Sequence, residues 1–253
     1  MLRSILATTV AAIAIGAVAP AASAQSFDDV EFKLTPYIWI AWPEGDIETA
    51  GGGGSNLPPI QANFDDVSLS GMFTGSADAR FGRFGVFGDL SYYEIEADKN
   101  IDITGDLFVD GNFEVSGLKG IIAGYYRVYQ NDRASFDVLA GAHYLEASVG
   151  LDLTTPNRTL SGDVDDDWWD FILGLRGEYA ISEHFGVEGF GFYGGFGGDS
   201  EELYDLFAAA NWRFNDMFTA SLGWRWFSNT FNGDRLDFET SFSGPLVGLE
   251  FTF

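Results

Sequence analysis

Apolar and polar residues alternate with a period of two along most of this chain, and the spacing typical of amphipathic helices is absent. In the closing stretch PLVGLEFTF, the residues Pro245, Val247, Leu249, Phe251 and Phe253 would share one face of a strand. The alternation predicts ten strands, at about Val30 to Trp42, Val67 to Arg80, Phe84 to Asp98, Asn112 to Tyr129, Ala134 to Leu151, Trp168 to Ile181, Phe185 to Gly197, Tyr204 to Phe214, Met217 to Phe231 and Phe242 to Phe253.

The connections between these strands alternate between short and long. RFGRF, YQNDRA, SEHF and FND are tight turns, whereas the other connections are longer and polar, at about 43–66, 98–111, 152–167, 199–203 and 232–241. An even number of strands joined in this way is typical of an antiparallel up-and-down barrel of the outer-membrane type, with both chain ends on the periplasmic side. We therefore predict an all-β transmembrane barrel of about ten strands, with eight or twelve as alternative counts.

A soluble barrel or a secreted β-sandwich would also show alternation, because its apolar face would form the core. The aromatic residues favour the membrane barrel. Trp169 and Tyr179 bracket aliphatic residues on one predicted strand, and Trp212 and Trp224 stand at similar places on later strands. Such positions are expected for the girdles that aromatic residues form at the two interfaces of a bilayer.

The first 24 residues have the features of a cleaved secretory signal peptide. A cation at Arg3 precedes an uncharged apolar run, and Ala22-Ser23-Ala24 forms a small-x-small cleavage site. The run is shorter than the roughly 20 apolar residues of a membrane-spanning helix. We therefore predict export through the inner membrane, with the barrel formed by residues 25–253 in the cell outer membrane. The chain has no cysteine, which excludes a lipid-anchored N-terminus and disulfide bonds.

The composition supports a membrane-facing surface and argues against nucleic acid as a partner. The chain holds 24 Phe, 10 Tyr, 7 Trp and 32 Gly, more aromatic surface than a soluble core of this size needs. A formal net charge of −25 would repel nucleic acid rather than bind it.

One face of the predicted strands carries most of the charge, and this face would line the lumen. After the signal peptide 12 of the 13 basic residues remain, and seven of them fall on this face among acidic residues. We predict a lumen ion network rather than an open hole, because a barrel of ten strands is narrow enough for such side chains to fill it. The predicted network is formed by Lys33, Asp78, Arg80, Asp89, Lys119, Arg127, Asp137, His143, Asp170, Arg176, Glu178, Asp205, Arg213, Arg225 and Glu250.

The ordered set of strands resembles a family of small outer-membrane β-barrel proteins of Gram-negative bacteria. The resembling stretches include LTPYIWIAWPEGDI, ARFGRFGVFGDLSYYEI, FDVLAGAHYL, DFILGLRGEYAISEHFGVEGFGFYGGFG, WRFNDMFTASLGWRWF and GPLVGLEFTF, and together they cover nearly the whole mature chain. The resemblance implies no catalytic residue and no cofactor. A terminal Phe253 after alternating apolar residues also resembles the signal that the barrel-assembly machinery reads. His143 departs from the family pattern, in which an arginine would be expected.

His143 is the one histidine that we can place on the inward face, so it is the candidate for catalysis at the outer rim. Ser148 and Asp170 are its conceivable partners. We favour a hydrogen-bonded lumen histidine, because spacing along single strands does not define a triad. His184 falls in a periplasmic turn and is expected to be solvated.

The outer connections are acidic, with Asp163, Asp165, Asp166 and Asp167 in one of them. Carboxylates can hold Ca²⁺ or Mg²⁺, and divalent ions bridge the phosphates of lipopolysaccharide. The spacing does not match an EF-hand, and a solvated acidic rim is the simpler interpretation. We therefore assign no metal site, and keep divalent cations beside the lipid bilayer and lipopolysaccharide as expected partners.

Three functional hypotheses follow from the sequence. The first is a structural or surface-interaction barrel with a largely closed, charge-paired lumen and no enzymatic activity. The second is a narrow channel for small solutes, with a preference for cations. The third is a hydrolase acting on lipid or peptide at the outer rim, which depends on His143 alone.

Overall fold

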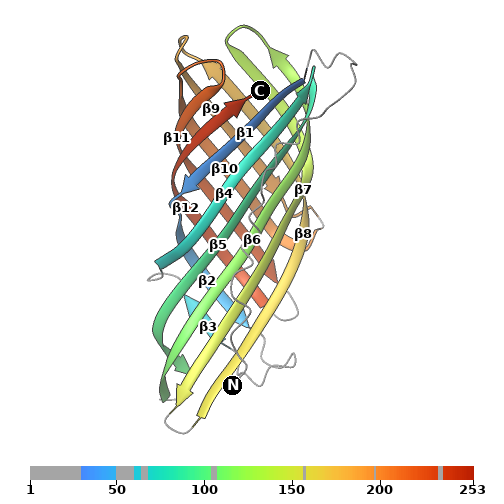
Figure 1. The fold of residues 1–253 in the computed structure, drawn as a ribbon. Helices are drawn as coiled ribbons and strands as arrows, with labels where there is room; N and C mark the ends of the chain where they lie inside the picture. The colour runs from blue at the N-terminus through green and yellow to red at the C-terminus, as the bar shows by residue number, and fades with distance from the viewer. Residues whose placement is uncertain are drawn as a thin grey trace, which may run out of the picture.

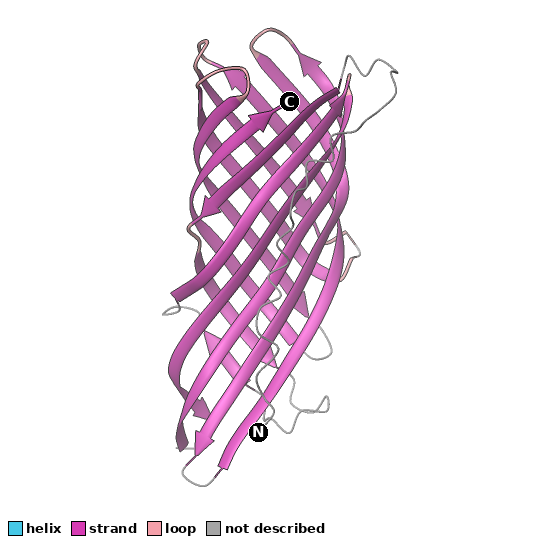
Figure 2. Cartoon of the chain, in the orientation of Figure 1, coloured by secondary structure: helices cyan, strands magenta, loops and turns pink. Residues whose placement is uncertain are grey.

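The computed structural model describes residues 30–49, 60–63, 68–103, 107–155, 158–196, 198–232 and 236–253. Nearly all of them lie in antiparallel strands that close into a tall barrel (Figure 1, Figure 2). In this part of the chain the strands are β1 (Val30–Trp39), β2 (Trp42–Thr49), β3 (Ile60–Asn63), β4 (Ser68–Phe81), β5 (Phe84–Ile103), β6 (Leu107–Gln130), β7 (Ala134–Thr155), β8 (Arg158–Ala180), β9 (Phe185–Gly194), β10 (Ser200–Arg213), β11 (Phe218–Asn232) and β12 (Leu236–Thr252).

These strands occupy ten positions around the barrel. β1 and β2 follow one another along the same side of β12 without a change of register, from Lys33 opposite Thr252 to Thr49 opposite Leu236. β3 and β4 occupy the next position with a register shift of two residues between them, because β3 pairs with β2 and β4 pairs with β1. The predicted ten-stranded antiparallel barrel is therefore confirmed. The prediction of one long loop at 43–66 is wrong for the residues of β2 and β3, because β2 continues the ladder with β12 and β3 pairs with β2.

The barrel closes through the pairing of β1 with β12. From Lys33, the strand pairings pass once around the barrel and return at Gly45, a stagger of 12 residues between positions 33 and 45. A closed barrel needs such a stagger because its strands tilt against the axis. The terminal Phe253 takes part in the closure, since its backbone N–H donates to the carbonyl of Phe32 at 2.9 Å.

The two ends of the barrel differ, and we call them the turn end and the loop end. At the turn end, short connections join β4 to β5, β6 to β7, β8 to β9 and β10 to β11, and the chain terminates there at Phe253. At the loop end, which is at the bottom of Figure 1, one wall extends far beyond the other. β5, β6, β7 and β8 contain 20, 24, 22 and 23 residues, whereas β9 contains 10 and β10 contains 14.

The length of this wall corrects several predicted strand ends. A strand crosses a bilayer in about 9–11 residues, so β5–β8 extend well beyond it. Sequence reasoning placed loops at about 98–111 and 152–167, where the structure continues the ladders of β5 with β6 and of β7 with β8. β12 likewise begins at Leu236 rather than at Phe242, and β9 ends at Gly194 rather than at Gly197. Polar and acidic residues are tolerated on strands outside the bilayer, because water faces the outer side there.

The outward surface forms an apolar belt between two rings of aromatic side chains. Exposed aliphatic residues such as Leu90, Ile122, Leu173, Leu222 and Val247 form the belt. Near the turn end, the aromatic pairs are Phe84 with Tyr126 at 5.0 Å, Phe185 with Trp212 at 4.8 Å and Phe218 with Phe251 at 5.3 Å between ring centroids. Toward the loop end they are Tyr144 with Trp169 at 4.7 Å and Trp42 with Trp224 at 5.8 Å. This is the surface expected of a barrel that faces lipid.

The predicted signal peptide, residues 1–24, lies outside the described residues and stays a prediction. Within the described residues, no helix is long and apolar enough to cross a membrane.

Candidate functional site: the charged lumen

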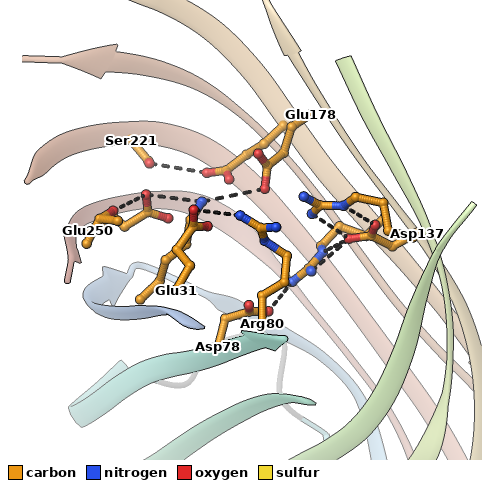
Figure 3. Close-up of polar contacts among 12 residues, drawn as sticks. Glu31, Asp78, Arg80, Asp137, Glu178, Ser221 and Glu250 are labelled. Atoms are coloured by element: carbon orange, nitrogen blue, oxygen red, sulfur yellow. Dashed lines mark hydrogen bonds and ion pairs between the residues drawn. The ribbon is translucent and has the colours of Figure 1, made fainter. Parts of the chain in front are cut away.

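The first group of lumen charges lies near the turn end (Figure 3). Asp137 on β7 accepts hydrogen bonds from Arg127 Nε at 2.8 Å and from Arg176 Nη2 at 2.8 Å. Arg176 on β8 also donates to Asp78 on β4 at 2.6 Å, and Asp78 accepts a further bond from the Tyr125 hydroxyl at 2.7 Å. Two carboxylates and two guanidiniums from four strands are thus joined by charge-assisted hydrogen bonds, the stronger class of hydrogen bond in proteins.

A looser set of charges lies beside this group. Lys33 on β1 is 3.7 Å from Glu178 and 3.4 Å from Glu250. Glu188 accepts a hydrogen bond from the Ser221 hydroxyl at 3.2 Å. Arg80 pairs with Glu31 at 2.7 Å on the neighbouring strand (Figure 3). We call all of these residues the turn-end cluster: Glu31, Lys33, Asp78, Arg80, Arg127, Asp137, Arg176, Glu178, Glu188 and Glu250.

A second group, the central cluster, lies deeper in the lumen and consists of Tyr37, Asp89, Lys119, Asp205 and Arg225. Arg225 binds both oxygens of Asp205, with Nε–Oδ1 at 2.8 Å and Nη2–Oδ2 at 2.6 Å, and reaches Asp89 at 2.9 Å. Lys119 donates to Asp205 at 2.8 Å, and the Tyr37 hydroxyl donates to Asp89 at 2.7 Å. Lys119 is 2 % exposed, Arg225 1 % and Asp205 0 %. Each charge is therefore removed from water and compensated by an opposite charge.

Aromatic side chains separate and cover the two clusters. Phe87, Phe190, Phe192 and Phe207 form a chain of ring contacts at 5.1–6.2 Å. The cations lie over aromatic faces: Arg176 over Tyr125 at 4.3 Å, Lys119 over Phe227 at 4.4 Å and Arg225 over Phe190 at 5.4 Å from the ring centroid. These cation–π contacts are favourable where the cation has lost its water.

The loop end of the lumen is mainly aromatic and aliphatic. Trp168 stacks on Phe231 at 4.2 Å, and Tyr93 contacts Phe242 at 5.3 Å. Leu145, Ala147 and Leu203 are fully buried and belong to the same hydrophobic cluster. The polar contacts here are local: Asp170 accepts from the Ser200 hydroxyl at 2.6 Å, and the Asn229 amide donates to the same hydroxyl at 2.7 Å.

Two spaces of the described lumen lie next to the charged clusters. A vestibule of about 370 Å³ opens at the turn end and is lined by residues of the tight turns together with Lys33, Arg127 and Glu188. A smaller cavity of about 80 Å³ lies between the two clusters. Its wall includes Lys33, Glu188, Phe190 and Arg225. The smaller cavity ends against Tyr37, Asp89 and Arg225 of the central cluster, whose side chains are almost inaccessible to water.

The structure departs from the sequence-based expectations at three of the predicted network residues. Arg213 is exposed at the mouth of the vestibule, and no described acid forms an ion pair with it. Asp170 binds Ser200 rather than a cation. His143 was expected to be hydrogen-bonded, but both ring nitrogens are buried without a partner and the ring stacks on Phe227 at 5.5 Å. Neither Ser148 nor Asp170 hydrogen-bonds to it, since Ser148 donates to Asp165 at 2.5 Å.

Sequence reasoning missed several members of the clusters. Tyr37, Tyr125, Glu31 and Glu188 also face inward, and the same alternation that located Lys33 and Glu178 could have found them. The particular pairings could not be found in this way. Arg176, for example, bonds to Asp78 on β4 and to Asp137 on β7.

Among the described residues, no three His, Asp or Glu side chains are placed to hold a metal ion. Asp165 and Asp167 are exposed on β8, and the side chain of Asp163 lies outside the described part. The association of divalent cations with the acidic outer surface therefore stays a prediction.

A closed antiparallel barrel with an apolar outer belt, aromatic girdles and a charged lumen is a β-barrel of the outer-membrane type. No protein-family model matches the chain, and no curated protein matches it. Solved structures similar to it include the translocator domain of the autotransporter NalP from Neisseria meningitidis, with 12 % identity, a TM-score of 0.49 and 88 % of each chain covered. The transport unit of the autotransporter AIDA-I from Escherichia coli has 9 % identity and a TM-score of 0.40, with 91 % of this chain and 93 % of that chain covered. The outer membrane protein OprG from Pseudomonas aeruginosa has 11 % identity and a TM-score of 0.35, with 88 % and 94 % covered.

Proposed function

We propose that this protein is an integral outer-membrane barrel whose lumen is closed by paired charges and whose role is structural or lies in surface interactions. The observation that supports this proposal is the burial of the central cluster. Lys119, Asp205 and Arg225 span the lumen from β6, β10 and β11, and each is at most 2 % exposed. An aqueous path through the barrel would hydrate these groups.

The cost of removing charges from water supports a permanent closure. A buried ion needs several kcal/mol of compensation, which here comes from ion pairs and hydrogen bonds on every side. Opening the lumen would require these pairs to separate together. Aromatic residues on both sides of the cluster, such as Phe190 and Phe227, would also have to move.

Recording of single channels in planar lipid bilayers tests the proposal. The wild-type barrel should show little or no conductance, whereas Arg225→Ala should open a measurable aqueous path. A steady conductance of the wild-type protein would refute the closed barrel. The variant must be shown to be folded by its heat-dependent shift in gel mobility, so that a silent variant can be interpreted.

A narrow, cation-preferring channel is the second candidate function. The turn-end cluster favours it, because six acids stand there against the four cations Lys33, Arg80, Arg127 and Arg176. An excess of acids around a vestibule raises the local concentration of cations. If the wild-type barrel conducts, a reversal potential that indicates cation selectivity, and its loss in Glu178→Gln with Glu250→Gln, would support this alternative.

The third hypothesis, a hydrolase at the outer rim, gains nothing from His143. Its ring is 0 % exposed, and its conceivable partners Ser148 and Asp170 are bonded to other residues. We infer that the barrel has no enzymatic activity. An activity on lipids that is lost in His143→Ala would contradict this inference.

We further propose that the turn end faces the periplasm and that Phe253 is needed for assembly by the barrel-assembly machinery. The aromatic ring of Phe253 is exposed, 6.1 Å from the ring of Phe32, and its backbone pairs with β1 at the closing seam. Deletion of Phe253 should reduce the amount of barrel in the outer membrane severalfold. Normal levels after the deletion would contradict the assembly role and leave the closed lumen untouched.

A further inference from the structure

The loop-end part of β8 has a strand on one side only. Within the described residues, Arg158 to Ala180 pair with β7 along their full length, but pairing with β9 begins at Ile172. β9 ends at Gly194, and the following Gly195 has a φ of 98°, a left-handed conformation that suits glycine and turns the chain away. The segment from Arg158 to Asp167 is therefore a sheet edge.

The direction of the backbone groups along this edge follows from its neighbours. The N–H of Ala180 donates to Arg133 on the β7 side, whereas the N–H of Trp169 donates to Asp199 on the opposite side at 3.2 Å. Successive residues of a strand alternate in this respect. Asp167 and Asp165 therefore direct their N–H and C=O groups to the open side, as Trp169 does.

One backbone N–H on the open side is hydrogen-bonded to a side chain instead of to a neighbouring strand. The N–H of Asp167 donates to the side chain of Asp166 at 3.1 Å, in place of a backbone carbonyl on a neighbouring strand. The backbone N–H and C=O of Trp169 are likewise hydrogen-bonded to a loop residue, Asp199, rather than to a strand. From Asp167 outward, the described chain offers no further strand on that side.

The side chains along the edge are acidic and face water. Asp165 and Asp167 are exposed and point outward, as does Glu146 directly opposite Asp167 on β7. The Tyr144–Trp169 pair marks the aromatic ring of the membrane belt, so these acids lie beyond it. The ion pairs of the described residues lie in the lumen or at its turn end, so no described cation neutralises this group.

We propose that this edge binds an extended, basic segment of another protein, which adds to the sheet as a strand next to β8. The proposal rests on the surface-interaction role proposed above and names its partner class. An edge of this kind binds a peptide through backbone hydrogen bonds, and side chains at alternate positions provide specificity. The segment would take the place that a longer β9 would have filled, and it would end at Asp199.

The charge of the edge selects the partner. Like charges directly opposite one another are unfavourable in a sheet, so the aspartates oppose pairing with a second copy of the same edge. Lysine or arginine at every second position would instead lie beside Asp165 and Asp167 on the outward face. The sequence of the partner should therefore alternate between basic and small polar or β-branched residues.

Binding to a synthetic peptide in lipid nanodiscs tests the proposal. The probe is a fluorescent peptide of alternating lysine and threonine, and fluorescence anisotropy measures its affinity for the whole barrel. The affinity should fall as salt is raised, and a peptide of alternating glutamate and threonine should not bind. Equal binding of both peptides would overturn the role of charge.

Two variants separate backbone pairing from simple charge attraction. Asp165→Pro removes an N–H on the open side, where proline is tolerated on an edge strand, and should weaken binding by about tenfold or more. Asp165→Asn removes only the charge and should weaken it by up to about fivefold, the effect of one cross-strand pair. If Asp165→Pro binds no more weakly than Asp165→Asn, the peptide does not add as a strand.

Two controls complete the experiment. Glu239→Gln removes an exposed acid from β12 and should leave the affinity unchanged. A lysine–threonine peptide that is N-methylated at every second residue keeps its charge but cannot form the ladder, so it should bind weakly. Full binding of that peptide would overturn the proposal. None of these results depends on conductance, so a failure here is distinct from a failure of the closed-lumen proposal.

Discussion

The two ends of the lumen use the alternation of the strands in opposite ways. At the turn end, charged side chains such as Lys33 and Arg127 point inward, and aromatic side chains such as Tyr126 point outward. At the loop end, Trp168 and Leu145 are buried inside, whereas Asp167 is exposed outside. The difference follows from the medium outside the wall, which is lipid near the turn end and water beyond the outer aromatic ring. A period of two therefore identifies a strand, but does not by itself say whether its apolar face points into the lumen or outward.

The comparison implies that interactions in the middle of the lumen, which are remote from both openings, contribute most to stability. Asp205→Ala should have the largest effect, because it leaves Lys119 and Arg225 buried with less compensation. We expect a loss of about 3–5 kcal/mol in the free energy of unfolding, the usual result of breaking a buried ion pair. Urea unfolding in detergent, followed by tryptophan fluorescence, measures it. A loss below about 1 kcal/mol would mean that water already reaches the cluster.

Arg176→Ala should have a smaller effect, because the carboxylates that it leaves retain other donors. Asp137 keeps Arg127 and Asp78 keeps Tyr125. We expect a loss of about 2–3 kcal/mol and no conductance, since the cavity would join the vestibule but the central cluster would still close the lumen. Thermal unfolding and bilayer recording of the same preparation measure both. A rise in conductance would mean that the turn-end cluster also forms part of the barrier to ions.

At the loop end, packing rather than charge should determine stability. A Cβ atom on Gly117 would lie 2.2 Å from the ring of Tyr93, so Gly117→Ala should displace that ring and cost about 1–3 kcal/mol. Gly124→Ala is the matched control, because a Cβ there would meet nothing within 4 Å. Equal melting temperatures of the two variants would show that the loop end is loosely packed.

The smallest effect on stability is expected for the ion pairs that are most exposed to solvent. The side chain of Lys33 is 21 % exposed and that of Glu178 is 38 % exposed, at a distance of 3.7 Å. Lys33→Met should change the free energy of unfolding by less than about 1 kcal/mol, and added salt should reduce the difference further. A change as large as that of Asp205→Ala would remove the contrast between the turn end and the centre.

The number of strands could be predicted from the sequence because alternation is a local property of each segment. The strand ends could not be predicted, since acidic stretches such as DVDDDW resemble loops. They are compatible with a strand only where the strand extends beyond the bilayer into water. The inward position of Lys119 and Arg225 could be predicted from period and polarity. The contacts of Arg225 with Asp89 and Tyr37 could not, because they depend on which strands the closed barrel brings face to face. Asp205, by contrast, lies on β10, the neighbour of β11. The isolation of His143 likewise depends on which side chains reach across the lumen.

The contacts of Arg225 also have a consequence for the order of folding. Arg225 meets Asp89 across 136 residues of sequence and Tyr37 across 188. No hairpin formed by neighbouring strands contains these contacts, so the central cluster assembles only after the first and last strands have met. Until then its charges remain hydrated, and the growing sheet has no stable interior. Contacts this far apart in sequence make folding slow and highly cooperative. The barrel should therefore pass from an open sheet to its final form in one late step, without a stable half-closed state.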